Sequence, residues 1–136
     1  YRRVRGPVVV EDFSLQLHYY MGFPGPLVKW PTTTPLGAHA ICNMLAHVRG
    51  EARAATVQLA CAYHDGSSPK IFLGERYGQI ADSPRGDGFA TGQVFIPKGY
   101  TKTWSQMEEI DLKATSVRKL AYRQLKGFLD TYKPRE

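Results

Sequence analysis

Two neighbouring carboxylates, Glu11 and Asp12, follow directly after a run of three valines. The run at residues 8–10 is β-branched and comes after Gly6 and Pro7, so it predicts a buried strand that delivers both carboxylates at its carboxyl end. For residues 13–20 two alternatives are open, a further extended stretch or a bend. Acidic groups in such a place can hold a metal ion and orient a water molecule. Taken alone, the pair is equally an ordinary polar end of a strand.

Positive side chains could supply the other half of phosphate chemistry. The chain has 18 Lys and Arg against 12 Asp and Glu, which gives a formal net charge of +6. Such a charge favours contact with phosphates, whether on a nucleotide, on RNA or at an acidic protein surface, because Lys and Arg neutralise phosphoryl oxygens. The basic residues are spread along the chain, so a solvated positive surface is the alternative.

The elements that would position these groups alternate between strands and helices. Residues 22–35 are interrupted by several prolines and glycines, which predicts a loop. Residues 36–48 carry apolar side chains at helical spacing and are followed by Gly50, which predicts a helix. Residues 54–63 and 70–73 are strand-like and flank a Gly- and Ser-containing turn, so we expect a β-hairpin there.

The last part of the chain is predicted to end in an amphipathic helix. Short strands are expected at residues 77–81 and 94–96, and the pattern becomes helical after Gly99. Ser116 is a suitable N-cap for a terminal helix. The apolar side chains after it form one stripe, and the opposite face carries basic residues, which by default face solvent.

Length and composition indicate one soluble globular domain. The chain has 136 residues, 43% of them hydrophobic, and no run of about 18 apolar residues that could span a membrane. Cys42 and Cys61 lack metal-ligand spacing, so we expect buried thiols in a reducing compartment. The expected location is therefore intracellular, in the cytoplasm or in an organelle matrix such as that of mitochondria.

Four collinear motifs resemble those of the inosine triphosphate pyrophosphatase family. Residues 6–15, GPVVVEDFSL, resemble the family's strand with an acidic pair, and residues 22–30, GFPGPLVKW, resemble its Gly-Leu-Pro-Gly-Pro loop with a phosphate-facing lysine. Residues 78–89 resemble the approach to the base-binding loop, and residues 97–107 resemble the segment after it. The resemblance continues into the final helix and covers nearly the whole chain.

The resemblance implies a fold and a reaction. The expected fold is an α/β domain with a long, mixed, strongly twisted sheet, helices packed against it and a cleft between two lobes. Residues 1–136 would form a single domain that corresponds to the C-terminal two thirds of the family fold. The family cleaves purine nucleoside triphosphates between the α and β phosphates and releases pyrophosphate, with Mg²⁺ bridging phosphate oxygens to carboxylates.

The resemblance also assigns roles to individual residues. Asp12 matches the acidic position that binds metal and acts as general base, and Glu11 beside it is the second metal-binding candidate. Phe89 matches the aromatic residue that stacks near the base, although it could simply belong to the core, and Lys29 could merely cap a surface loop. The substrate-binding candidates are Lys29, Phe89, Lys113, Ser116 and Arg118.

Several family features are replaced or absent. Gly92 stands where the family has a base-contacting aspartate, and Val117 stands where it has a histidine between serine and arginine. Lys113 lies one residue closer to Arg118 than the family spacing requires. The Thr-Gly-Asn-x-x-Lys phosphate turn and a further metal-binding glutamate are not in this sequence, so about a third of the fold would be missing and one sheet edge left open.

Three hypotheses about function follow. The first, which the replaced residues favour, is a catalytically degenerate structural subunit of a larger assembly that contains protein and, given the charge, RNA. The alternative is an active pyrophosphatase that hydrolyses ITP, dITP or XTP with Mg²⁺ and whose N-terminal part is absent from this sequence. The third is a module that binds a purine nucleotide without turnover. A homodimer of the family type is a further expectation.

Overall fold

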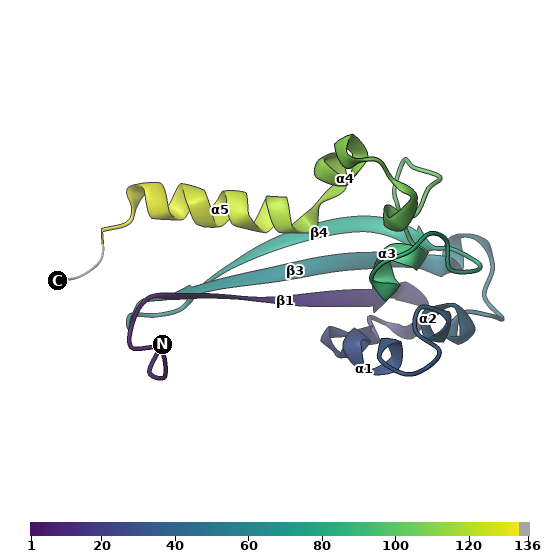
Figure 1. The fold of residues 1–136 in the computed structure, drawn as a ribbon, viewed down its shortest axis with the longest axis horizontal. Helices are drawn as coiled ribbons and strands as arrows, with labels where there is room; N and C mark the ends of the chain where they lie inside the picture. Colours follow the sequence, from purple (N-terminus) through teal and green to yellow (C-terminus); the bar gives the residue numbers. More distant parts are fainter. Residues whose placement is uncertain (134–136) are drawn as a thin grey trace.

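The computed structural model describes residues 1–133, which form an open antiparallel sheet with helices packed beside it (Figure 1). The strands are β1 (Val8–Leu17), β2 (Pro24–Gly25), β3 (Ala54–His64), β4 (Lys70–Ile80) and β5 (Phe95–Pro97). The α-helices are α1 (Lys29–Thr32), α2 (His39–Met44), α3 (Ala90–Val94), α4 (Glu109–Thr115) and α5 (Val117–Thr131). Short 3₁₀ helices span His18–Tyr20, Pro26–Val28, Gly50–Arg53 and Trp104–Gln106.

The sheet has the strand order β2-β1-β3-β4-β5. β1 pairs with β3 along its whole length, and β3 and β4 form the predicted hairpin. The predicted α/β fold with a long sheet and packed helices is confirmed. The pairing differs in one respect: every strand pair among residues 1–133 is antiparallel, where a mixed sheet was expected. β4 also runs without a break to Ile80, so residues 77–80 of the separate strand predicted at residues 77–81 belong to it.

The two faces of the sheet differ because successive side chains of a strand point to opposite sides. On one face Leu15, Leu17 and Leu59 are buried in the core, and α5 packs on the β3 and β4 part of this face. On the other face Val10 and Ile71 are exposed. Among the described residues, positions 8–14 of β1 pair with β3 only, so this part of β1 is an open edge of the sheet, as expected.

Helix α5 begins where the sequence predicts it. The Ser116 hydroxyl accepts a hydrogen bond from the Lys119 amide at 3.1 Å, which caps the helix. The helix approaches β4 so closely at Gly74 that a side chain there would overlap the carbonyl oxygen of Val117. Within residues 1–133, no helix is long and apolar enough to cross a membrane.

A buried arginine connects three segments at the end of the sheet near α2. Arg53 is almost fully buried, and its guanidinium donates to the carbonyl oxygens of Leu45 at 2.6 Å, Val48 at 3.0 Å, Ile80 at 2.9 Å and Ala81 at 2.7 Å. A buried charge is tolerated only when it is bonded in this way. The carbonyls of Leu45 and Val48 both accept from Arg53, and the Leu45 carbonyl also accepts from the Val48 amide in a turn.

This bonding explains why α2 is shorter than predicted. The sequence predicted a helix over residues 36–48, whereas α2 spans His39–Met44 and the chain then turns towards Arg53. Cys42 in α2 and Cys61 in β3 are buried free thiols, as predicted. Burial raises the pKa of both thiols, which keeps them protonated at neutral pH.

Candidate functional site

A cleft of about 690 Å³ opens between the sheet and the beginning of α5. Its walls are formed by Phe13 and Leu59 of the sheet, by Asp87 and Phe89 of the preceding loop, by Trp104, Ser105, Met107 and Leu112, and by Ser116, Val117 and Arg118. This volume is in the usual range for small-molecule sites. The cleft therefore brings together three of the predicted residues, namely Phe89, Ser116 and Arg118.

Aromatic rings form one wall of this cleft. The Phe89 ring lies edge-to-face with Phe13 at a centroid distance of 6.3 Å, and it lies 6.3 Å from Trp104. Phe89 is 60% exposed, so it does not belong to the core and its ring remains accessible. An accessible ring in a cleft can stack on a planar ligand.

The indole of Trp104 is fixed by a buried hydrogen-bond chain. Its Nε1–H donates to the Thr115 hydroxyl at 2.9 Å, and that hydroxyl donates to the Asp111 carbonyl oxygen at 2.8 Å. Thr115 lies at the end of α4, directly before the cap of α5. The aromatic wall is thereby connected to the junction of the two helices.

Arg118 is held in place by Glu11. Its Nη2 lies 2.7 Å from Oε1 of Glu11, its Nε lies 3.1 Å from Oε2, and the Tyr122 hydroxyl donates to Oε2 at 3.1 Å. These hydrogen bonds, chiefly those from Arg118, lower the pKa of Glu11 and also raise the pKa of Arg118. Glu11 is thus an ionised partner of Arg118, and both of its oxygens are occupied.

The prediction that β1 ends at the acidic pair is wrong. The strand continues to Leu17, because the residues after Asp12 pair with β3 and alternate into the core. Glu11 and Asp12 lie inside the strand, and their side chains point to opposite faces. Glu11 lies on the α5 face, and Asp12 is an exposed side chain of the other face. One ion cannot contact both side chains from the same face.

Two predicted lysines lie outside the cleft. Lys29 begins α1, which lies beside the carboxyl end of β1, and its side chain is exposed (Figure 1). Lys113 lies on α4, where it forms an ion pair with Glu109. Neither lysine lines the cleft that contains Phe89. Neither Glu11 nor Asp12 lines it, so a cleft that the acidic pair shares with Lys29 stays a prediction.

No group of three or more metal-ligating side chains occurs within residues 1–133. Mg²⁺ does not require such a group, since it commonly binds one or two carboxylates together with substrate phosphates and water. The exposed carboxylate of Asp12 meets this minimum. Glu11 does not, because its oxygens already accept hydrogen bonds from Arg118 and Tyr122.

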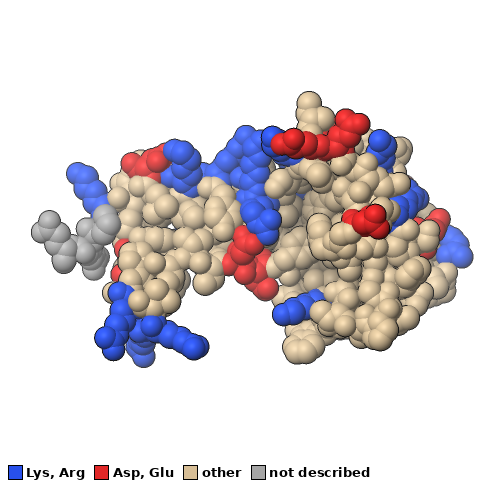
Figure 2. All heavy atoms as spheres, viewed as in Figure 1, with Lys and Arg blue, Asp and Glu red and all other residues tan. Residues whose placement is uncertain are grey.

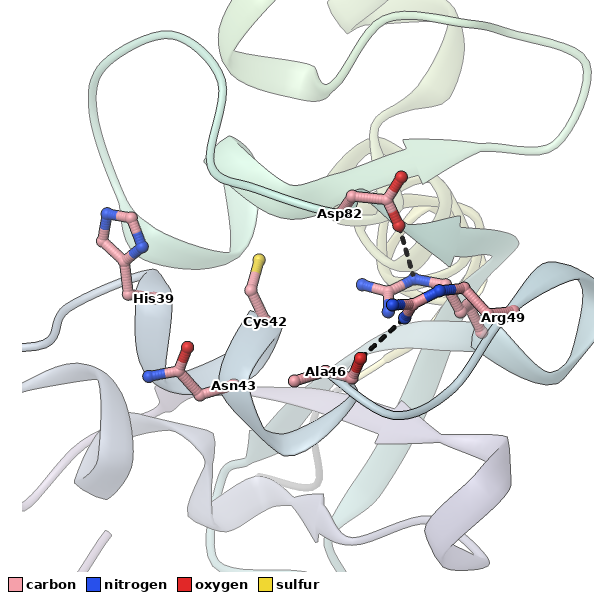
Figure 3. A pocket seen from close by; sticks show the side chains of 7 residues that line it. His39, Cys42, Asn43, Ala46, Arg49 and Asp82 are labelled. Carbon is pink, nitrogen blue, oxygen red and sulfur yellow. Dashed lines mark hydrogen bonds and ion pairs between the residues drawn. The ribbon is translucent and has the colours of Figure 1, made fainter.

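A second pocket, of about 400 Å³, lies beside α2. Figure 3 shows Cys42 on one side of it and Asp82 on another, with the Asp82 carboxylate directed away from Cys42. Arg49 donates to the Ala46 carbonyl at 2.6 Å, and Arg53 Nε lies 3.6 Å from Asp82. These two cations mainly bind backbone carbonyls, so their role here is to support the fold.

Sequence reasoning missed much of the cleft wall. Phe13 could have been found from its strand position, because it lies two residues after Glu11 and therefore on the same face. Trp104 lies far away in the sequence, and nothing local connects it to Phe89. Basic side chains lie in several separate groups on the face that Figure 2 shows, in agreement with their spread along the sequence.

The fold and the cleft define an open-sheet α/β protein with an aromatic side cleft. Solved structures share this fold: the Ham1 protein of Staphylococcus aureus has a TM-score of 0.83 at 24% identity, covering 97% of this chain and 71% of that one. A Ham1 protein from Coxiella burnetii has a TM-score of 0.80 at 22% identity, covering 93% of this chain and 68% of that one.

The model of the Ham1 family matches residues 1–128, and the chain belongs to this family. A dITP/XTP pyrophosphatase of Hyperthermus butylicus is 36% identical over 135 residues, covering 98% of this chain and 70% of the relative. An inosine triphosphate pyrophosphatase of Giardia intestinalis is 36% identical over 127 residues, covering 91% of this chain and 64% of the relative. The resemblance noted in the sequence is thus confirmed, over about two thirds of the length of these relatives.

Proposed function

We propose that the protein is a nucleoside triphosphate pyrophosphatase that hydrolyses ITP, dITP and XTP to the monophosphate and pyrophosphate. The observation that carries this proposal is the aromatic cleft, in which the accessible Phe89 ring lies beside the helix start that bears Ser116 and Arg118. The names of the curated relatives support the same reaction. The chain matches only 70% and 64% of the length of these relatives, so we assign the activity to the whole protein.

The cleft would bind the base, and the phosphates would extend past the open edge of β1 to Asp12, which lies on the other face of the sheet. A purine would stack on Phe89, while Arg118, kept in position by Glu11, would lie beside the nucleotide. Asp12 would orient a water molecule for attack on the α-phosphorus and accept its proton as the bond to the pyrophosphate leaving group breaks. Lys29 would neutralise charge on the phosphate oxygens.

Nucleoside triphosphate pyrophosphatases generally need a divalent metal. Asp12 is the carboxylate in the described chain that would hold Mg²⁺, and the metal would neutralise charge that gathers on the phosphate oxygens. Glu11 would act through Arg118 instead, because its oxygens are already bonded.

The expected catalytically degenerate subunit of an RNA-containing assembly receives no support. The relatives carry the names of pyrophosphatases, so they favour the alternative of an active enzyme. Gly92 and Val117 replace two polar side chains of the family, so this protein would contact the edge of the base with other groups. We further propose that the open edge at residues 8–14 is covered in the working protein, because unpaired strand groups invite association.

The test is pyrophosphate release from ITP, dITP and XTP with Mg²⁺, measured on the protein translated from its whole reading frame. Asp12→Asn should lower the rate by about 100-fold or more, the usual contribution of a positioned base. Glu75→Gln is a matched control, since Glu75 is an exposed carboxylate on the same face of the sheet. Pyrophosphate release that Asp12→Asn leaves unchanged would refute the proposal.

The 136-residue chain by itself should hydrolyse these nucleotides negligibly. The phosphate-binding turn and the second metal carboxylate expected for the family are not in this sequence, and one preorganised donor alone contributes about 3 kcal/mol to the transition state. Asp12-dependent turnover by the 136-residue chain would show that this chain contains a sufficient site.

A further inference from the structure

A carboxylate at the cleft wall has no bonded partner within the described residues. Asp87 lines the same cleft as Phe89, and its side chain is exposed. No hydrogen bond or ion pair within residues 1–133 engages its oxygens, in contrast to Glu11, which is bonded to the cleft residue Arg118. Asp87 therefore presents a free acceptor to whatever occupies the cleft.

The backbone that carries Asp87 is braced on both sides. The Arg85 amide donates to the Gln93 carbonyl at 2.8 Å, and the Gln93 side-chain amide donates to the Gly88 carbonyl at 2.7 Å. The Thr103 hydroxyl donates to the Arg85 carbonyl at 3.1 Å. A charged group on a braced loop is preorganised, because little conformational freedom is lost when it binds.

Glycines on either side direct the loop. Gly86 has φ +75° and Gly88 has φ +104°, a region that favours glycine. A Cβ at Gly86 would lie 2.7 Å from the Ser105 carbonyl oxygen, so the loop packs directly against another wall of the cleft. This packing determines where the Asp87 side chain begins.

The adjacent ring of Phe89 is also fixed in place. It packs over Gly92, where a Cβ would lie 2.7 Å from the ring atom Cε1. An aspartate at position 92 would displace the ring, so this position cannot carry the carboxylate. The carboxylate closest to Phe89 in the sequence is Asp87. A planar base on Phe89 would share the cleft with that carboxylate.

The chemistry of a carboxylate restricts which base edge it can bind. An ionised carboxylate accepts hydrogen bonds and donates none. A 6-oxopurine carries an N1–H donor on its pairing edge, and guanine adds the neighbouring 2-amino donor, whereas adenine has an acceptor at N1. Two adjacent donors match the two oxygens of one carboxylate.

We propose that Asp87 reads the base edge in this cleft and selects 6-oxopurine nucleotides, guanine nucleotides included, over adenine nucleotides. The proposal rests on the proposed function, because it takes the cleft to be the base site. Gly92 and Val117 have no polar side-chain atoms for the base edge, and Asp87 would take over this contact.

Calorimetric titration with GMP, IMP and AMP in the absence of metal tests this selection on the protein from the whole reading frame. IMP offers the N1–H alone and should bind with an affinity between those of GMP and AMP, whereas GMP should bind at least about 10-fold more tightly than AMP, as one good bidentate contact provides. Asp87→Asn should reduce this ratio to about threefold or less, because an amide offers a donor as well as an acceptor. Asp87→Glu, which keeps the acceptor, should retain part of the preference.

Two controls separate base reading from general damage. Phe89→Ala should weaken all three nucleotides to a similar extent, and Asp82→Asn, an exposed aspartate of the other pocket, should change none of them. The urea midpoint of Asp87→Asn should equal that of the wild type, since the side chain has no bonded partner among residues 1–133.

Equal binding of the three nucleotides by the wild type, or a preference that Asp87→Asn leaves intact, would overturn this inference. If the nucleotides bind equally but pyrophosphate release still depends on Asp12, the proposed function stands and only the role of Asp87 is refuted. Failure of every nucleotide to bind, together with absence of hydrolysis, would overturn both.

Discussion

Replacing Gly74 by alanine tests how closely α5 packs on the sheet. A Cβ at this position would overlap the carbonyl oxygen of Val117 and lie 3.0 Å from the Ala121 amide nitrogen, and both are helix backbone. Backbone cannot rotate away as a side chain can, so the helix must shift. Overpacking of this kind costs about 1–3 kcal/mol, which exceeds the gain of about 0.4–1 kcal/mol from a stiffer unfolded chain.

Urea unfolding followed by circular dichroism measures the result. A net loss of about 2 kcal/mol at a slope of about 2 kcal/mol per molar urea lowers the midpoint by about 1 M. Gly127→Ala in the middle of α5 is the matched control, because no atom lies within 4 Å of its added Cβ. The Gly127→Ala substitution should raise the free energy of unfolding by about 0.5–1 kcal/mol. A Gly74→Ala protein as stable as the wild type would refute the close approach.

Three further outcomes are expected. A hydrogen bond from Ser67 is the largest cause that lowers the pKa of Asp65 to about 2, below its unfolded value, so the stabilisation is present above about pH 4 and is lost as pH falls towards 2. Asp65→Asn should therefore flatten the free energy of unfolding over that window in an acid titration. A double-mutant cycle between Glu11 and Arg118 should give about 0–1 kcal/mol, because Arg118 is largely exposed and Glu11 is partly exposed, and a value above about 2 kcal/mol would contradict this. Thr115→Val, which removes the acceptor of a buried indole N–H, should cost about 1–3 kcal/mol in urea unfolding.

Local patterns were sufficient to predict the hairpin and the final helix. The alternation in residues 54–63 and the turn after it depend on neighbours in the chain, and so does the cap at Ser116. The end of β1 could not be predicted in the same way. A polar pair marks an end only if no partner strand continues beyond it, and β3 does continue, as far as the pairing of Leu17 with Ala55.

Motifs predicted a part of the candidate site and missed the rest. Phe89, Ser116 and Arg118 were predicted to share a site and do line one cleft. Asp87 lies only two residues before Phe89, but its role depends on the bracing of the loop, which involves Thr103. A motif identifies which residues matter together, and the long-range contacts determine which additional side chains reach the same space.

The buried guanidinium of Arg53 has a consequence for hydrogen exchange. One side chain holds the carbonyls of Leu45, Val48, Ile80 and Ala81, which belong to segments far apart in the sequence. None of these segments can move away without leaving a buried charge partly unpaired, and the cost of that state is shared by all of them. Amide protons in the neighbourhood of α2 and of the end of β4 should therefore exchange as one cooperative unit with a common opening free energy.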